Sequence, residues 1–112
     1  MPRRGNELVV ISWRDIPAQV NARAGAEKHQ VVLARRFQRA IDEAAMVAGK
    51  KTASEYVGQW RRTSLEIPAG FDSLAGVAEQ EARRLDEAFP KERLQRFVDN
   101  GGWDPDAAEP EA

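Results

Sequence analysis

The chain has 112 residues, of which 42% are apolar and 31% are charged, a balance typical of a single globular domain. It contains no cysteine, which excludes disulfides, thiol nucleophiles and cysteine metal sites. No apolar run approaches the roughly 20 residues that a membrane helix needs. The arginines near the N-terminus are not followed by the apolar stretch of a signal peptide, so we expect a cytoplasmic protein without membrane contact.

The net charge of −1 is unevenly distributed along the chain. Residues 1–66 carry 12 basic against 7 acidic side chains, a net of +5, and residues 67–112 carry 5 against 11, a net of −6. This polarity could steer an acidic partner to the first half of the chain. It could equally reflect two charged faces of one domain, and an excess of +5 is weak beside that of dedicated nucleic-acid binders.

The most strongly patterned stretch is 8–20, which reads LVVISWRDIPAQV. Its unbroken apolar run from Leu8 to Trp13 predicts a strand, and the lack of alternation indicates burial on both faces, as in the centre of a sheet. Pro17 cannot donate a backbone hydrogen bond, so this strand must end or bend before it.

Two further short strands are predicted, an edge-like one at 18–23 and another at 29–33. The residues Ala24 and Gly25 between them are typical of a turn, so the two strands would form a hairpin. An alternative is that residues 22–33 begin the helix that follows.

Helical spacing of apolar residues begins near Ala34 and predicts a helix over 34–48. The sequence Thr52-Ala-Ser-Glu55 then has the form of a capping box and predicts a short helix that reaches Trp60, with Tyr56, Val57 and Trp60 facing inward. The two helices would form a helical hairpin with a tight joint.

The second half of the chain has one more strand signal and two helix signals. The strand is predicted at 61–67 from the alternation of its residues and is ended by Pro68-Ala69-Gly70. The first helix is capped by Asp72 or Ser73 and has an apolar stripe that continues to Ala88. The second helix begins at Pro90 and ends at Asn100-Gly101-Gly102.

These elements predict an α+β fold with a small sheet of three to four short strands, packed by the helical hairpin and by one or two C-terminal helices. The predicted domain spans 1–102, with Trp103 as a possible final anchor. Residues 103–112 are predicted to be an acidic disordered tail, because they contain two prolines and several acids.

The sequence predicts no catalytic residue, metal site or cofactor. His29 is the only histidine, and the usual zinc sites need more histidine or cysteine ligands. The carboxylate pairs Asp42-Glu43 and Asp86-Glu87 lie on predicted helices, where adjacent side chains point about 100° apart and do not share a site. No nucleophile elbow or phosphate-binding loop is present, so an enzyme is not expected.

A better candidate for function is the cluster Trp13-Arg14-Asp15 at the exit of the predicted central strand. Arg14 could grip a carboxylate or phosphate with two hydrogen bonds, and Trp13 could offer a stacking face. The alternative is structural, with Asp15 capping the turn before Pro17 and Arg14 pairing with a carboxylate inside the protein.

Trp60-Arg61-Arg62 has a similar composition, and aromatic residues among arginines can bind single-stranded nucleic acid. The arginines at 35, 36 and 39 could extend such a basic face. No helix-turn-helix, RNA-binding motif or basic tract supports this reading, so the second interpretation is that Trp60 lies in the core with its arginines at the rim.

The stretches VVISWRDIPAQV (9–20), LARRFQRAIDEAAM (33–46) and YVGQWRR (56–62) resemble the small bacterial "virulence factor" domain family. In that family an I-x-W-R-D-I-P-A-Q-V core precedes an R-F-Q-x-A-I-D-x-A-A-M helix and a W-R-R end. The resemblance covers about residues 7–85. It implies a link to bacterial virulence and an accessory role in one-carbon metabolism beside folate and corrinoid methyl-transfer proteins, and it provides no active site to transfer.

The leading hypothesis from the sequence is therefore a non-catalytic cytoplasmic domain that binds a protein partner, for example a methyl-transfer enzyme. A second hypothesis is a ligand-binding or catalytic component of one-carbon and methyl-transfer metabolism that binds an anionic, folate-like small molecule through Arg14. A third is a weak nucleic-acid binder. The residues predicted to form the partner surface are Trp13, Arg14, Asp15, Gln19, Arg61 and Arg62.

Overall fold

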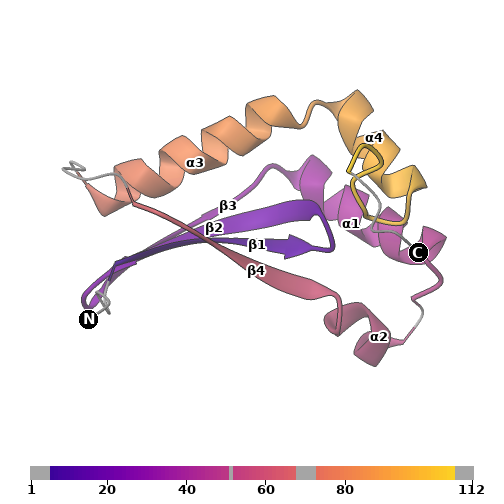
Figure 1. Ribbon diagram of the computed structural model, residues 1–112, viewed down its shortest axis with the longest axis horizontal. Helices are drawn as coiled ribbons and strands as arrows, with labels where there is room; N and C mark the ends of the chain where they lie inside the picture. The colour runs from indigo at the N-terminus through magenta and orange to yellow at the C-terminus, as the bar shows by residue number, and fades with distance from the viewer. Residues whose placement is uncertain (1–5, 51, 68–72, 108–112) are drawn as a thin grey trace.

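A computed structural model describes residues 6–50, 52–67 and 73–107, which form an antiparallel sheet and four helices (Figure 1). The fold is α+β, as the sequence predicts. In chain order the elements are β1 (Glu7–Trp13), β2 (Ile16–Ala24), β3 (Glu27–Val32), α1 (Arg35–Val47), α2 (Ala53–Val57), β4 (Trp60–Leu65), α3 (Leu74–Ala88) and α4 (Lys91–Asp99).

The four strands lie in the order β3-β2-β1-β4, and all neighbours are antiparallel. The prediction that β1 is a central strand is confirmed. The predicted hairpin of β2 and β3 is confirmed as well, so the alternative of a helix beginning near Ala22 does not occur. The prediction that β2 is an edge strand was wrong, because β3 pairs along its outer side and makes it internal.

Strand β1 ends at Trp13, and the two residues Arg14 and Asp15 connect it directly to β2. Pro17 is the second residue of β2 and lies opposite Ser12, where the register between the two strands shifts. The missing N–H of proline is tolerated at such an irregularity. The strand therefore does end before Pro17, although the chain continues at once into the next strand.

Residues on both faces of β1 are buried, as its continuous apolar pattern predicts. Leu8 and Val10 belong to the main core, and Val9 points to the opposite face because side chains alternate along a strand. Val9 is only 2% exposed. On that face Glu7 lies between Arg23, at 3.3 Å, and Arg62, at 3.5 Å, so an ion-paired cluster of long side chains surrounds Val9.

Helix α1 agrees with its sequence pattern, whereas α2 is shorter than its sequence pattern predicts. The apolar stripe of α1 is buried, and Gly49 follows its end with a φ of +75°, which favours glycine. The capping box of Thr52 and Glu55 is present, but α2 has only five residues and Val57 is 62% exposed, so its predicted inward position was wrong. The helix is short because Trp60 already pairs with Trp13 as the first residue of β4.

Helix α3 lies across β2 and β3, and α4 packs against α1 (Figure 1). The side chain of Ser73 accepts a hydrogen bond from the N–H of Gly76 at 2.9 Å and caps α3, as predicted. Pro90 directly precedes α4. The predicted strand end at Pro68-Ala69-Gly70 and the alternative cap Asp72 lie outside the described residues.

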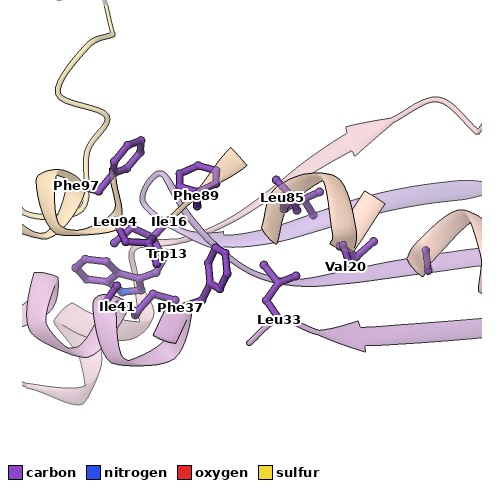
Figure 2. Close-up of a cluster of buried hydrophobic side chains, with 14 of the residues drawn as sticks. Trp13, Ile16, Val20, Leu33, Phe37, Ile41, Leu85, Phe89, Leu94 and Phe97 are labelled. Carbon is purple, nitrogen blue, oxygen red and sulfur yellow. The ribbon is translucent and has the colours of Figure 1, made fainter. Parts of the chain in front are cut away.

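The core lies between the sheet and the helices, and its aromatic part is near the β1–β2 turn (Figure 2). Phe89 packs edge-on against both Phe37 and Phe97, with ring centroids 6.0 Å and 5.2 Å apart. Trp13 and Ile41 are fully buried in the same cluster. The end of the sheet that carries the β1–β2 turn is thus fixed by residues from β1, α1 and α4 and by Phe89, which directly follows α3.

Within the described residues, no helix has the length and apolar character needed to cross a membrane.

Two substitutions on α1 test this packing. Ile41→Ala removes a fully buried side chain from the core and should lower the free energy of unfolding by about 2–5 kcal/mol. Met46→Ala, on the same helix but at a position 78% exposed, should change it by less than about 0.5 kcal/mol. Urea denaturation of both variants checks the difference, and equal effects would contradict the placement of this helix.

Candidate functional site

The β1–β2 turn is the point on which several contacts between distant segments converge. Arg14 adopts a φ of 53°, in the left-handed region, and is the single non-glycine residue to do so among the described residues. This conformation costs an L-residue roughly 1–2 kcal/mol. Contacts of the turn with the rest of the protein must therefore offset the strain.

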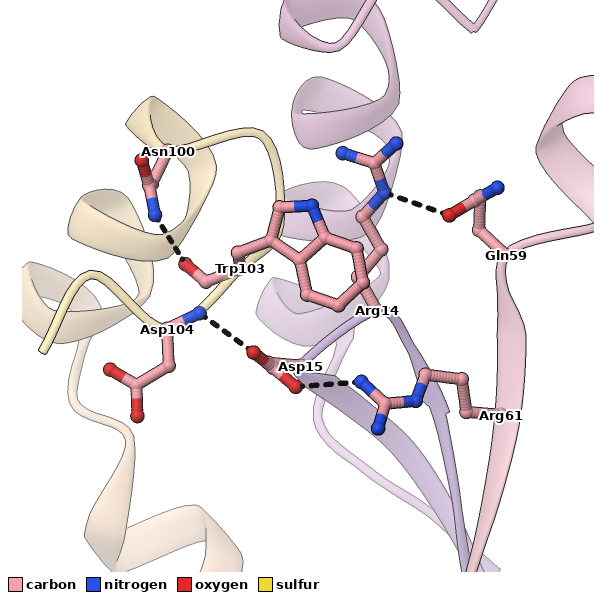
Figure 3. Close-up of polar contacts among 7 residues, drawn as sticks. All are labelled: Arg14, Asp15, Gln59, Arg61, Asn100, Trp103 and Asp104. Carbon is pink, nitrogen blue, oxygen red and sulfur yellow. Dashed lines mark hydrogen bonds and ion pairs between the residues drawn. The ribbon is translucent and has the colours of Figure 1, made fainter. Parts of the chain in front are cut away.

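The side chain of Arg14 makes several such contacts (Figure 3). Its Nε donates to Oε1 of Gln59 at 3.1 Å, and its Nη1 donates to the carbonyl oxygen of Gly101 at 2.9 Å. Gly101 lies just beyond α4, where a positive charge interacts favourably with the helix dipole. Partial burial lowers the pKa of the Arg14 guanidinium below its usual value through desolvation, although an arginine in a protein stays charged.

The guanidinium of Arg14 also contacts two indole rings. Its Cζ atom lies 5.1 Å from the ring centroid of Trp13 and 5.0 Å from that of Trp103. Both distances are within the range of cation–π attraction. Arg14 thereby connects the first strand of the sheet to the segment that follows the last helix.

Asp15, the second residue of the turn, also contacts segments that are distant in the sequence (Figure 3). Its carboxylate accepts hydrogen bonds from Nη1 of Arg61 at 3.0 Å and from the backbone N–H of Asp104 at 2.8 Å. Its own backbone N–H donates to the carbonyl oxygen of Gly102 at 2.9 Å. The carboxylate thus holds both β4 and the C-terminal segment.

Arg61 and Trp103 form the accessible part of this arrangement. The Cζ atom of Arg61 lies 5.7 Å from the ring centroid of Trp103, so the ring contacts two guanidinium groups. Trp103 is 41% exposed and the Arg61 side chain 51%. We name Arg14, Asp15, Arg61 and Trp103 the turn cluster.

Trp13 supports the turn cluster from inside the protein and has no exposed surface. Its indole N–H donates to the carbonyl oxygen of Tyr56 at 2.7 Å, and the two rings stack with centroids 5.7 Å apart. A Cβ atom at Gly102, where φ is +100°, would lie 2.9 Å from Cζ3 of Trp13. Glycine at this position therefore allows the C-terminal segment to lie directly against the indole.

The six residues predicted from the sequence form two groups in the structure. Trp13, Arg14, Asp15 and Arg61 lie together at the turn, whereas Gln19 and Arg62 both lie opposite Ile11, on its two neighbouring strands. The sequence reasoning missed Gln59, Gly101 and Asp104 as partners of the turn. The available signal was the Gly101-Gly102-Trp103 sequence, which places an aromatic residue directly after a helix end.

The contacts of Asp104 also bear on the predicted tail. Besides its hydrogen bond to Asp15, its side chain accepts from the N–H of Asp106 at 2.8 Å, and Asp106 pairs with Arg96 at 2.8 Å. The prediction of a disordered segment from Trp103 onward did not anticipate these contacts. Residues 108–112 lie outside the described part of the chain.

The carboxylate and histidine side chains of the described residues do not gather into a group of three that could hold a metal ion. His29 lies on β3 opposite Ala22, away from the β1–β2 turn along the sheet, and is 3.7 Å from a carboxylate oxygen of Glu79 on α3. The arrangement at the turn consists of cations, indoles and one engaged carboxylate, a chemistry suited to recognition.

A comparison with protein families gives a match to the family described as "Virulence factor", over residues 11–98. The chain belongs to this family. The match begins a few residues after the start of the sequence resemblance but continues past its end, through α4 as far as Val98. No curated protein and no solved structure matches the chain.

Within this virulence factor family domain, the matched residues contain the whole β1–β2 turn, Gln59 and Arg61. Gly101 to Asp104 follow the matched range. The turn cluster therefore combines side chains from the family region with one indole from the segment directly after it.

Two substitutions of Arg14 separate its contacts from its backbone strain. Arg14→Ala removes the hydrogen bonds and both cation–π contacts and should lower the free energy of unfolding by about 1–3 kcal/mol. Arg14→Gly removes the same contacts but relieves the strain of the positive φ, so it should be more stable than Arg14→Ala by about 1 kcal/mol. Urea denaturation measures both, and an Arg14→Gly variant as stable as the parent would show that the contacts contribute nothing beyond offsetting strain.

Proposed function

We propose that this virulence factor family domain is a non-catalytic cytoplasmic module that binds a protein partner through the turn cluster. The observation that carries the proposal is the partly exposed indole of Trp103, which lies in contact with the guanidinium groups of both Arg14 and Arg61. Tryptophan and arginine are enriched among the residues that contribute most to protein interfaces. An anchor already fixed in its place loses less conformational entropy on binding.

The charges of the turn cluster favour an acidic partner surface. Arg61 is paired with Asp15, whereas Arg14 donates to an amide oxygen and a backbone carbonyl oxygen. Within the described residues, no carboxylate lies within ion-pair distance of the Arg14 guanidinium. A partner carboxylate near Trp103 would complement this positive charge. A methyl-transfer enzyme is the first candidate partner, since the family resemblance suggests an accessory role beside such enzymes.

The geometry is less favourable for the two alternative hypotheses, binding of a folate-like small molecule and binding of nucleic acid. Arg14 uses Nε and Nη1 within the protein, so it does not present that pair of donors to a folate-like carboxylate. For nucleic-acid binding, Arg36, Arg61 and Arg62 each have a carboxylate within 3.5 Å. These pairs reduce the positive charge available to phosphates.

The proposal is tested by affinity purification with mass spectrometry, followed by measured affinity for the partner that is recovered. Trp103→Ala and Arg61→Ala should each weaken binding, Trp103→Ala by roughly 30-fold as expected for an interface anchor. Arg83→Ala, which removes an exposed arginine of α3, and Met46→Ala, which removes an exposed apolar side chain, are the matched controls. Thermal melting of all four variants checks that the fold is intact.

Three results would overturn the proposal. One is a partner that binds folded Trp103→Ala and Arg61→Ala at the parental affinity. A second is a thermal shift with folates or corrinoids that Arg14→Ala abolishes, which would support the small-molecule hypothesis. The third is binding of single-stranded nucleic acid whose affinity falls steeply with salt, as counterion release requires.

A further inference from the structure

The free edge of β4 is a second surface, and it begins at Arg61 inside the turn cluster. The strand order places β4 at the outside of the sheet (Figure 1). Among the described elements, β1 is the one that packs along it, and every residue of β4 after Trp60 is exposed. Such an edge is a template for a further strand unless side chains prevent pairing.

The hydrogen-bonding pattern shows which backbone groups of β4 are available. The N–H of Arg14 donates to the carbonyl oxygen of Gln59 at 3.0 Å, one residue pair beyond the Trp13–Trp60 pair. Hydrogen-bonded pairs alternate along an antiparallel ladder. The pairs that hold β4 to β1 are therefore Ser12–Arg61, Val10–Thr63 and Leu8–Leu65. The N–H and C=O groups of Arg62 and Ser64 consequently point away from the sheet.

We propose that β4 accepts an extended segment of the partner protein as an additional strand, a mode of binding that rests on the proposed function above. Main-chain hydrogen bonds to Arg62 and Ser64 would supply affinity, as in other domains that bind peptides by strand addition. Because Arg61 belongs both to β4 and to the turn cluster, one partner segment can reach both surfaces.

The side chains around β4 define the chemistry of this segment. A groove of about 260 Å³ lies between the end of β4 and α3, with Leu8, Leu65 and Val77 at its apolar base and Glu81 and Arg84 at its rim. An apolar side chain of the added strand fits this groove. At the other end of β4, Arg61 pairs with Asp15 and Arg62 with Glu7, but the two arginine side chains are still 51% and 62% exposed. A guanidinium has five N–H donors, so each arginine can also donate to an acidic residue of the segment.

A second copy of the chain is a poorer occupant of this edge. Pairing two β4 strands would place Arg61 and Arg62 of both copies along one seam, where like charges repel. An acidic segment of another protein is attracted by the same side chains. The arginines therefore oppose self-association while leaving the edge open to a partner of opposite charge.

The decisive variant is Ser64→Pro. Proline has no N–H, and its ring would occupy the place from which the partner strand approaches. The fold should hold, because the N–H of Ser64 is not used by β1 and the preceding Thr63 is already extended. Ser64→Ala keeps the N–H and is the matched control. Thr63→Pro removes a bond to β1 instead, so it should destabilise the domain.

The probe is a phage-displayed library of random linear peptides, selected on the intact protein. Selected peptides should bind Ser64→Ala as tightly as the parent and Ser64→Pro roughly tenfold more weakly or worse, with unchanged thermal midpoints. Hydrogen exchange should show that the amides of Arg62 and Ser64 become protected when the peptide binds. Acidic residues should be enriched in the selected peptides.

Four results would overturn strand addition: no selected peptide, equal affinity for Ser64→Pro and Ser64→Ala, no new amide protection on β4, or a dimer in light scattering that Ser64→Pro converts to a monomer. The two proposals fail separately. Binding of the purified partner that Trp103→Ala abolishes and Ser64→Pro leaves intact would retain the turn cluster and discard strand addition. Binding that Ser64→Pro abolishes and Trp103→Ala leaves intact would retain strand addition and discard the turn cluster.

Discussion

The contacts of the Arg14 guanidinium with the indoles of Trp13 and Trp103 connect the parts of this domain that are most distant in sequence. One indole belongs to the central strand and is buried in the core, and the other belongs to the segment after the last helix. The same guanidinium donates to the carbonyl oxygen of Gly101. The turn that carries Arg14 therefore positions the C-terminal segment, and Asp15 adds a second attachment through the backbone of Asp104.

Both proposed binding surfaces depend on this arrangement. Arg61 is oriented by Asp15 and stacks on Trp103, and it is also a residue of the exposed strand β4. The backbone of β4 is in turn fixed by β1, which ends at the turn. The proposed site thus combines an aromatic ring, two neighbouring guanidinium groups and the main chain of a strand that β1 pairs on one side.

The sequence predicts well those features that depend on neighbouring residues. The continuous apolar run of β1, the capping box at Thr52 and the turn at Gly25 each reflect local chemistry, and each is present in the structure. The internal position of β2 and the early end of α2 could not be predicted in this way. They are set by pairing with β3 and by the pairing of Trp60 with Trp13, which are contacts between separate segments.

In the candidate site, too, the sequence indicates the residues with local signals and misses those placed by contacts between separate segments. Arg14 and Asp15 were identified because they follow a buried strand, and Arg61 because it follows a tryptophan. Their partners in the C-terminal segment are 87 and 89 residues away along the chain, and no local pattern indicates such pairings. The positive φ of Arg14 was not predicted either, since a non-glycine residue in this region is stable only because of those remote contacts.

This separation along the chain has a consequence for how the domain assembles. The β1–β2 hairpin is local and can form quickly, whereas bringing Gly101 and Asp104 to its turn closes nearly the whole chain into a loop, which is entropically costly and slow. During synthesis Trp103 also leaves the ribosome after all the strands and helices of the described structure, because it follows α4 in the chain. The indole of Trp103 can thus reach Arg14 only after all these strands and helices have been synthesised. A partner that recognises this indole beside Arg14 would therefore bind chains in which the segment after α4 has reached the turn, and would not bind chains in which it has not.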